Sequence, residues 1–274
     1  MCPTVWRPWP RGISFLTRSN PPRWRKPGRL GVDSGRAVPL LPEPLRKRRV
    51  GFMRIALIHA LTHSVAPTAD AFARLWPDAA LMNLLDDSLS ADLARDGALT
   101  PAMTDRFLAL ARYAVSTGAD GILFTCSAFG PCIEACARDL APMPVLKPNE
   151  AMIEDAVALA GPTGRIGLLA TFPPTLESMP PEFHAAGGAG ISIEPCLAQG
   201  ALAALDRGDV AEHDAASVRA AQGMIGCDVI ALSQFSLARA APLIEKATAT
   251  RVLTTPDSAV RKLRRLLMTS RRED

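Results

Sequence analysis

The segment Gly-Ala-Asp-Gly-Ile-Leu-Phe-Thr at residues 118–125 is a short apolar run that begins with turn residues, which is typical of a buried strand. A related segment, Gly-Cys-Asp-Val-Ile-Ala-Leu-Ser, follows at residues 226–233, an offset of 108. Two further pairs of segments recur at nearly the same spacing, which indicates that one structural unit is present twice. These pairs are residues 54–60 with 165–171, at an offset of 111, and residues 144–153 with 251–260, at an offset of 107.

Apolar strands alternate with helical stretches from Met53 onward, a pattern typical of parallel sheets that are covered by helices on both faces. The predicted fold class is α/β. We expect two similar Rossmann-like or flavodoxin-like lobes, related by a pseudo-twofold axis, with an active cleft between them. The lobes are assigned to residues 53–160 and 161–274, and the last helix could pack on the first lobe. Strands are expected at 54–59, 80–85, 118–125, 144–146, 165–171, 191–193, 226–233 and 251–253, and helices at 68–77, 100–117, 131–140 and 150–160.

The charge of the chain is unevenly distributed. Residues 1–52 hold 12 of the 31 Lys and Arg side chains and only two acids, Asp33 and Glu43, so this segment carries a net charge of +10. The other 19 basic and 25 acidic side chains give the rest of the chain a net charge of −6. The first segment is interpreted either as a disordered, basic Pro- and Arg-rich tail or as a start codon assigned too early. A nucleic-acid partner is not favoured, because no basic and aromatic pattern continues into the body.

The composition of the body indicates a soluble globular protein. About half of the chain, 48%, is hydrophobic, yet no uncharged apolar run reaches the length of about 18 residues that a membrane span needs. The six cysteines form no dense framework of the secreted type, so a reducing, cytoplasmic location is expected. A homo-oligomer is left open.

The residues that follow each strand carry the candidate chemistry, because ligands of such sheets bind beyond the carboxyl ends of the strands. Cys126 lies at one of these ends and directly before a predicted helix, where backbone N–H groups and the positive helix end would stabilise a thiolate. The alternative is a buried, inert cysteine. His59 either lines the cleft or is a structural histidine. Lys147 either offers a charge to a second carboxylate or is a solvated lysine.

No cofactor or metal is expected. The chain has no Walker A sequence and no suitably placed GxGxxG, which disfavours nucleotide cofactors. Cys132 and Cys136 lie four residues apart and so share one face of a predicted helix, but no CxxC or histidine pair completes a metal site with them.

The twofold repeat, the segment at 118–127 and the Leu-Leu-Ala-Thr segment that ends at Thr171 resemble the aspartate/glutamate/hydantoin racemase superfamily over about residues 53–267. The resemblance implies cofactor-independent chemistry at a carbon next to a carboxylate. In racemases of this family, one cysteine from each lobe flanks the substrate. By this resemblance, Cys126 is the first-lobe thiol, and Ser127, Thr171 and Thr175 are carboxylate donors. The implied partner is a small carboxylate or an amino acid.

The chain departs from the family pattern in the second lobe. Gln234 occupies the place of the second cysteine, and a carboxamide can hold a carboxylate or carbonyl but does not act as an acid or a base near pH 7. The resulting one-thiol site is compatible with racemisation that uses another second base such as His59, with one-sided proton chemistry as in decarboxylases, or with nucleophilic cis–trans isomerisation. A non-catalytic carboxylate-binding protein is the remaining alternative.

Overall fold

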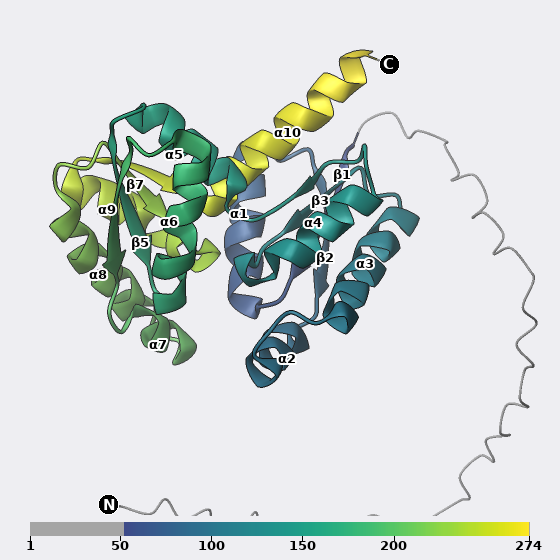
Figure 1. Cartoon of the computed structure of the whole chain (residues 1–274), viewed down its shortest axis with the longest axis horizontal. Coiled ribbons are helices and arrows are strands. Elements are labelled where there is room, and N and C mark those ends of the chain that lie inside the picture. Colours follow the sequence, from purple (N-terminus) through teal and green to yellow (C-terminus); the bar gives the residue numbers. More distant parts are fainter. Residues whose placement is uncertain (1–51, 274) are drawn as a thin grey trace, which may run out of the picture. The chain divides into compact units, whose positions relative to one another are not determined.

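The computed structural model describes residues 52–273, and for the last four of these only the helical backbone is considered (Figure 1). The interpretations of the basic segment at 1–52 therefore lie outside the described residues, apart from Phe52 itself. No helix between residues 52 and 273 combines the length and the apolar character that a membrane crossing needs.

The strands form two parallel four-stranded sheets, which confirms the predicted α/β class. The strand order is the same in both sheets: β2-β1-β3-β4 in the first and β6-β5-β7-β8 in the second. The first sheet consists of β1 (Arg54–His59), β2 (Ala80–Leu85), β3 (Gly121–Phe124) and β4 (Val145–Leu146), and the second of β5 (Arg165–Ala170), β6 (Ser192–Leu197), β7 (Val229–Leu232) and β8 (Arg251–Thr254).

The two sheets also agree in register, so the sequence repeat extends to individual residue pairs. Ile55 lies opposite Gly121 in the first sheet, and the residues found by adding the repeat offsets, Ile166 and Val229, lie opposite each other in the second. One hydrogen bond at the start of each sheet is equivalent as well. The Arg54 backbone N–H donates to the Asp120 carboxylate at 2.8 Å, and the Arg165 N–H donates to Asp228 at 2.7 Å.

Helices flank both sheets. The helix α3 begins as its Thr-Pro sequence predicts: the Thr100 hydroxyl caps the Met103 N–H, and Pro101 occupies the first turn, where its missing N–H costs nothing. The α-helices are α1 (Val65–Leu75), α2 (Ser88–Asp96), α3 (Pro101–Ser116), α4 (Gly130–Asp139), α5 (Glu150–Ala160), α6 (Pro173–Gly187), α7 (Ala201–Asp206), α8 (Val210–Ala221), α9 (Ala241–Thr248) and α10 (Thr255–Glu273). Short 3₁₀ helices are η1 (Thr62–Ser64), η2 (Ser127–Phe129), η3 (Gln222–Met224) and η4 (Phe235–Ala240).

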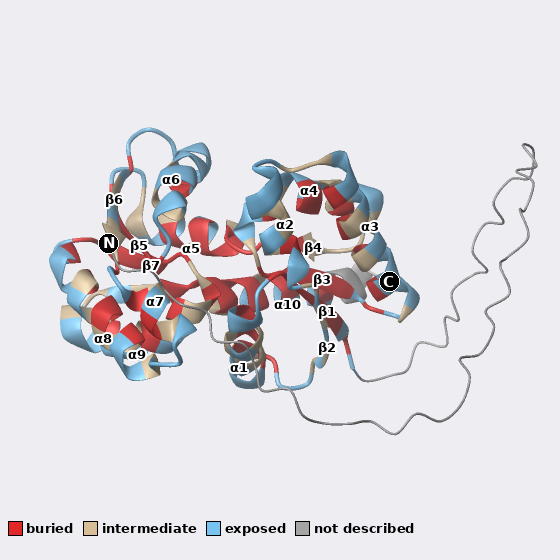
Figure 2. Ribbon diagram, turned by 90° about the horizontal axis from the view of Figure 1, so that it is seen from below, coloured by how far each residue is buried: buried red, intermediate tan, exposed pale blue. Residues whose placement is uncertain are grey.

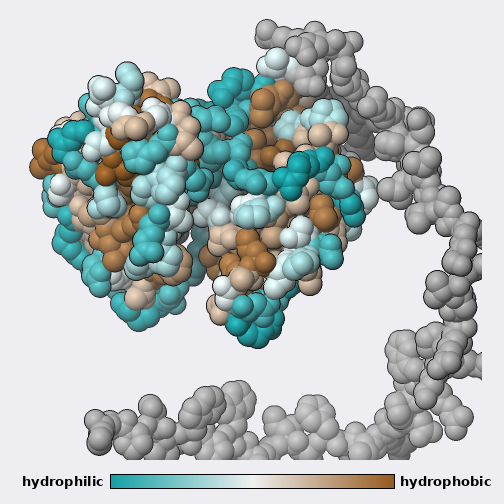
Figure 3. All heavy atoms as spheres, in the orientation of Figure 1, coloured by the Kyte–Doolittle hydropathy of each residue, from teal (hydrophilic) through white to brown (hydrophobic). Residues whose placement is uncertain are grey.

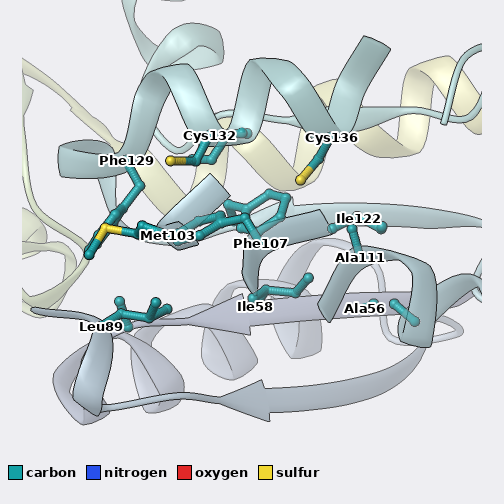
Figure 4. Close-up of a cluster of buried hydrophobic side chains, with 14 of the residues drawn as sticks. Ala56, Ile58, Leu89, Met103, Phe107, Ala111, Ile122, Phe129, Cys132 and Cys136 are labelled. Carbon is teal, nitrogen blue, oxygen red and sulfur yellow. The ribbon is translucent and has the colours of Figure 1, made fainter. Parts of the chain in front are cut away.

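Buried residues concentrate on the strands and on the helix faces turned toward them (Figure 2). One face of the first sheet packs against α3 and α4, where Phe107 stacks between Phe124 and Phe129 at ring-centroid distances of 5.4 and 4.9 Å. Figure 4 shows this cluster, with Phe107 and Phe129 between α4 and the strands. On the face of the whole molecule drawn in Figure 3, hydrophobic areas are small and separated by hydrophilic ones.

Two helices pack on the sheet of the opposite half of the chain. Leu263 of α10 belongs to the same apolar cluster as Leu57 and Leu123 of the first sheet. Gly121 makes this close approach possible, because a β-carbon at that position would lie 3.1 Å from the Leu263 side chain. Conversely, Ile153 of α5 packs with the second sheet. The predicted boundary between the two lobes, at residues 160 and 161, follows the order of the chain and stays a prediction. In the packing, α5 of the first half lies with the second sheet and α10 of the second half lies with the first.

Candidate active site

Cys126 and Gln234 occupy equivalent positions in the two halves. Each stands two residues beyond the end of a central strand, β3 or β7, in extended backbone conformation, and each is the residue from which a 3₁₀ helix starts. The φ and ψ angles are −132° and 116° at Cys126, and −118° and 148° at Gln234. The hydroxyl residues that precede them, Thr125 and Ser233, donate backbone N–H bonds to Ile58 and to its counterpart in β5 at 3.1 and 3.0 Å.

The thiol of Cys126 is partly buried against the apolar cluster of the first sheet. Burial raises its pKa above the ordinary thiol value, and a hydrogen bond from the Ala128 backbone N–H opposes this rise. The sequence predicted a thiolate stabilised by the loop and the following helix. Desolvation outweighs this effect, so the group is a protonated thiol at neutral pH. A space beside it, too narrow for a water molecule, is lined by Ile58, His59, Ala60, Leu89, Phe107 and Phe124.

Gln234, Thr171 and Thr175 come together in one hydrogen-bonded group, although they are up to 63 residues apart in the chain. The Gln234 Oε1 atom accepts from the Thr171 backbone N–H at 3.0 Å and from the Ser233 hydroxyl at 2.9 Å. Its Nε2 atom donates to Thr175 Oγ1 at 3.0 Å. The carboxamide is thus held at both ends, and the Thr175 hydroxyl, which accepts this bond, keeps its own proton for a ligand.

Ser127 follows Cys126 as the first residue of η2, and it is exposed. It is not a member of the group around Gln234. Ser127 lies next to Cys126 because it is the following residue in the chain. Its role as a carboxylate donor stays a prediction.

His59 is fully buried and bonded at both ring nitrogens. Nε2–H donates to Asn83 Oδ1 at 3.0 Å, and Nδ1 lies 2.9 Å from Thr125 Oγ1 and 3.0 Å from Ser64 Oγ. Because the Ser64 hydroxyl donates to the Leu61 carbonyl at 2.7 Å, the Thr125 hydroxyl is the donor to Nδ1. Burial lowers the His59 pKa, and the bond to Asn83 opposes this shift only in part, so the ring is neutral.

The partners of His59 were not predicted from the sequence. Asn83 of β2 and Thr125 after β3 reach His59 because β1 is paired with both strands, whereas Ser64 lies in the loop that follows β1. The one available signal was the repeat itself, which aligns Thr125 with Ser233 and so places a hydroxyl directly before both Cys126 and Gln234.

The loops that follow β1 and β7 touch. The η1 helix, which follows β1, contacts η4, which starts after Gln234. In the same region, His63 Nε2 lies 3.2 Å from Asp206 Oδ1 at the end of α7. Segments from both halves of the repeat therefore meet beside the strand ends that carry Cys126 and Gln234.

Lys147 follows β4 and is paired with Glu134 at 2.9 Å. The hydrogen bond to Glu134 raises the Lys147 pKa, and the charges of Glu182 and Glu150 add to this rise. The ammonium group of Lys147 is thus already paired with a carboxylate of the chain, and a role toward a second substrate carboxylate stays a prediction.

Cys132 and Cys136 point from α4 into the apolar cluster of the first sheet (Figure 4). Both thiols are fully buried, and burial with the charges of Cys132 and Asp139 raises the pKa of Cys136 to about 12. Within residues 52–273, no three His, Cys, Asp or Glu side chains are grouped so that they could hold a metal ion.

A comparison with protein families shows which family the chain matches. The Asp/Glu/Hydantoin racemase family matches residues 59–263, about three quarters of the chain. The chain belongs to this family. No curated protein sequence matches it.

Solved structures of two racemases and of a decarboxylase resemble the chain at low sequence identity. A glutamate racemase from Bacillus anthracis has 11% identity and a TM-score of 0.59, with 80% of this chain and 82% of that one covered. The allantoin racemase from Klebsiella pneumoniae has 21% identity and a TM-score of 0.59, with 80% and 89% covered. A glycine-to-cysteine mutant of arylmalonate decarboxylase has 22% identity and a TM-score of 0.53, with 78% and 93% covered. At these identities the likeness establishes the fold.

Proposed function

We propose that this protein is a cofactor-independent racemase or related isomerase that acts at the carbon next to a carboxylate, with Cys126 as the group that moves the proton. The substrate class is an amino acid or a small carboxylic acid. The observation that carries the proposal is the equivalent placement of Cys126 and Gln234 at the ends of β3 and β7 in a member of the racemase family.

The group around Gln234 supports a binding role for the second half of the chain. Thr175 Oγ1 accepts from Gln234 and can donate its own proton to a substrate carboxylate. One N–H of the Gln234 carboxamide is also left for a ligand. Such donors stabilise the enediolate-like charge that develops when a proton leaves the α-carbon. Ser127 is proposed as a further donor beside the thiol.

His59 supports a positioning role. A fully buried, neutral ring with both nitrogens bonded cannot reach a substrate without breaking its hydrogen bonds. Its bond to Thr125 instead fixes the residue that directly precedes Cys126. We therefore propose that His59 orients the thiol, in place of the substrate contact that the sequence suggested.

One-sided proton chemistry, as in a decarboxylase or a cis–trans isomerase, is the second candidate. The Gln234 carboxamide is held by Thr171, Ser233 and Thr175 and does not act as an acid or a base near pH 7. A single thiol can remove and return a proton on the same face of the carbon, which exchanges the proton without inverting the centre.

A deuterium-exchange experiment tests both candidates. The full chain is incubated in deuterated water with amino acids, hydantoins and arylmalonates, and incorporation at the α-carbon is followed by NMR together with chiral chromatography. We expect exchange that Cys126→Ser abolishes and that Cys196→Ser, a partly buried thiol elsewhere in the second sheet, leaves unchanged. Inversion with exchange identifies a racemase, and exchange with retention identifies one-sided chemistry.

The same experiment can contradict the proposal. If exchange persists in Cys126→Ser, Cys126 is not the group that moves the proton. Ligands that raise the unfolding temperature without any exchange would identify a carboxylate-binding protein instead, because binding alone stabilises the folded state by mass action.

The five described cysteines are all free, which favours the proposed cytoplasmic location.

A further inference from the structure

A cavity of about 410 Å³, largely open to solvent, lies between the end of α1 and the middle of α10, away from the candidate active site. Its volume falls within the range of small-molecule sites. The lining contains neither a nucleophile nor a general base, which makes it unsuited to catalysis. The cavity is lined by Leu75, Arg261, Arg264, Arg265 and Met268.

The three arginines share one face of α10 because their spacing is i, i+3 and i+4. This face of α10 does not pack against the rest of the protein as the opposite face does. Leu263 packs on the first sheet, and Lys262 binds Glu150 and Glu154 of α5 at 3.0 and 2.7 Å. The arginine face is therefore left toward solvent, where all three side chains are exposed.

Positive charge around the cavity is only partly neutralised. Asp257 binds Arg74 at 2.7 Å and lies 3.9 Å from Arg261. Arg264 Nη1 donates to the Leu75 carbonyl at 2.8 Å, and its other N–H groups remain available. Among the described residues, Arg265 has no ion pair. The Asp257 carboxylate is thus shared by two guanidinium groups, those of Arg74 and Arg261.

We propose that this cavity binds a phosphorylated small molecule that also carries an apolar group, of the size of a nucleoside monophosphate. Guanidinium groups recognise phosphate oxygens through paired N–H donors, which a cluster of three can supply around one phosphate. Leu75 and Met268, whose side chain is 40% exposed, supply the apolar wall for the other part of the ligand.

Calorimetric titration of the full chain tests this site, with AMP, inorganic phosphate and adenosine as separate probes. We expect AMP to bind more tightly than inorganic phosphate and adenosine not to bind. The double variant Arg261→Ser with Arg265→Ser is expected to weaken AMP binding at least tenfold. It retains Arg264, which bonds the end of α1. Arg219→Ser, an exposed arginine of α8 that is paired with Glu212, is the matched control and should leave binding unchanged.

Three outcomes would overturn the proposal. The first is the absence of binding by every phosphate compound at millimolar concentration. The second is AMP binding that is equal in the wild type and the double variant, which would place the ligand elsewhere on the chain. The third is binding of inorganic phosphate as tight as that of AMP, which would show that the apolar wall contributes nothing to binding. Circular dichroism of the double variant confirms that a loss of binding does not come from unfolding.

Discussion

The Cys126 thiol should determine the pH dependence of catalysis. Burial raises its pKa, so the thiolate that acts as a base becomes populated only when the pH approaches a value above the ordinary thiol pKa of about 8.5. We expect kcat/KM to rise with pH from 7 to 9, since this parameter reports the ionisation of the free enzyme. Deuterium exchange measured across this range checks the expectation. A rate that is constant or falls over the same interval would contradict a thiolate base with a raised pKa.

Gln234→Cys should change the stereochemical outcome of the reaction. The substitution places a second thiol at the position equivalent to Cys126, so that each half of the repeat presents one. If the native chain exchanges protons with retention, we expect the variant to racemise the same substrate. Chiral chromatography measures the inversion, and Gln234→Ser is the control because it removes the carboxamide without adding a thiol. Inversion in the control would show that the sulfur is not responsible.

The sequence placed Cys126 and Gln234 correctly at strand ends because a repeat of constant spacing fixes both positions in the fold. It could not predict the environment of His59. Whether a histidine faces a cleft or a closed network depends on Asn83 and Thr125, which reach it through strand pairing between distant segments. Likewise, the direction of the Cys126 pKa shift depends on how closely apolar side chains pack around the sulfur, which no local pattern encodes.

At the scale of secondary structure elements, one arginine of α3 holds α2 in place. Arg106 donates to Asp92 within α2 and to Asp86 just before it, both at 2.6 Å. Burial would raise the Asp86 pKa, but hydrogen bonds from Ser88 and Arg106 outweigh it and lower the pKa. The ion pair is therefore complete at neutral pH and is lost only when the pH falls below the ordinary carboxylate range. Leu89 of α2 lines the space beside Cys126.

Arg106→Met should expose the Cys126 thiol. Without its two ion pairs, α2 is expected to move away from the strand ends and to open the wall that Leu89 forms. The rate of thiol labelling at pH 8, with the labelled residue identified by mass spectrometry, should rise several-fold at Cys126. Arg95→Met is the matched control, because Arg95 binds Asp92 and Asp96 within α2 itself. Equal labelling in wild type and Arg106→Met would contradict this role.

The α2 helix was missing from the elements expected from the sequence. Only Leu89 of its nine residues is buried, so its apolar pattern is too weak to indicate a helix. Its position depends on an arginine in the next helix. The strands were easier to predict, because the central strands β1, β3, β5 and β7 are buried along nearly their whole length and read as continuous apolar runs.

At the scale of the whole described body, each half of the repeat contributes one helix to the core of the other half's sheet. We call this arrangement the exchange of helices. The helix that follows β4 completes the core of the second sheet, and the helix that follows β8 completes the core of the first. Lys262 of α10 also binds Glu150 and Glu154 of α5, so the exchanged helices are linked to each other. The stability of each sheet therefore depends on a helix from the other half of the chain.

This exchange predicts which sheet each core substitution loosens. Leu263→Ala and Ile153→Ala each remove a buried side chain and should lower the free energy of unfolding by about 2–5 kcal/mol. Leu263 lies near the end of the chain, yet we expect its loss to speed hydrogen exchange mainly in β1 and β3. Loss of Ile153 should act mainly on β5 and β7, because its side chain belongs to the same apolar cluster as Ile166 of β5 and Val229 of β7.

Hydrogen exchange followed by mass spectrometry separates the two sheets, and Leu266→Ala, an exposed leucine of α10, controls for effects of the helix itself. If each buried substitution loosens the sheet of its own half, the exchange of helices does not occur in solution. If both substitutions speed exchange equally in both sheets, the body opens as one cooperative unit and the two halves have no separate stability. The packing of α5 and α10 agrees with only one result. Loss of Leu263 in α10 must speed exchange in the first sheet, and loss of Ile153 in α5 must speed exchange in the second.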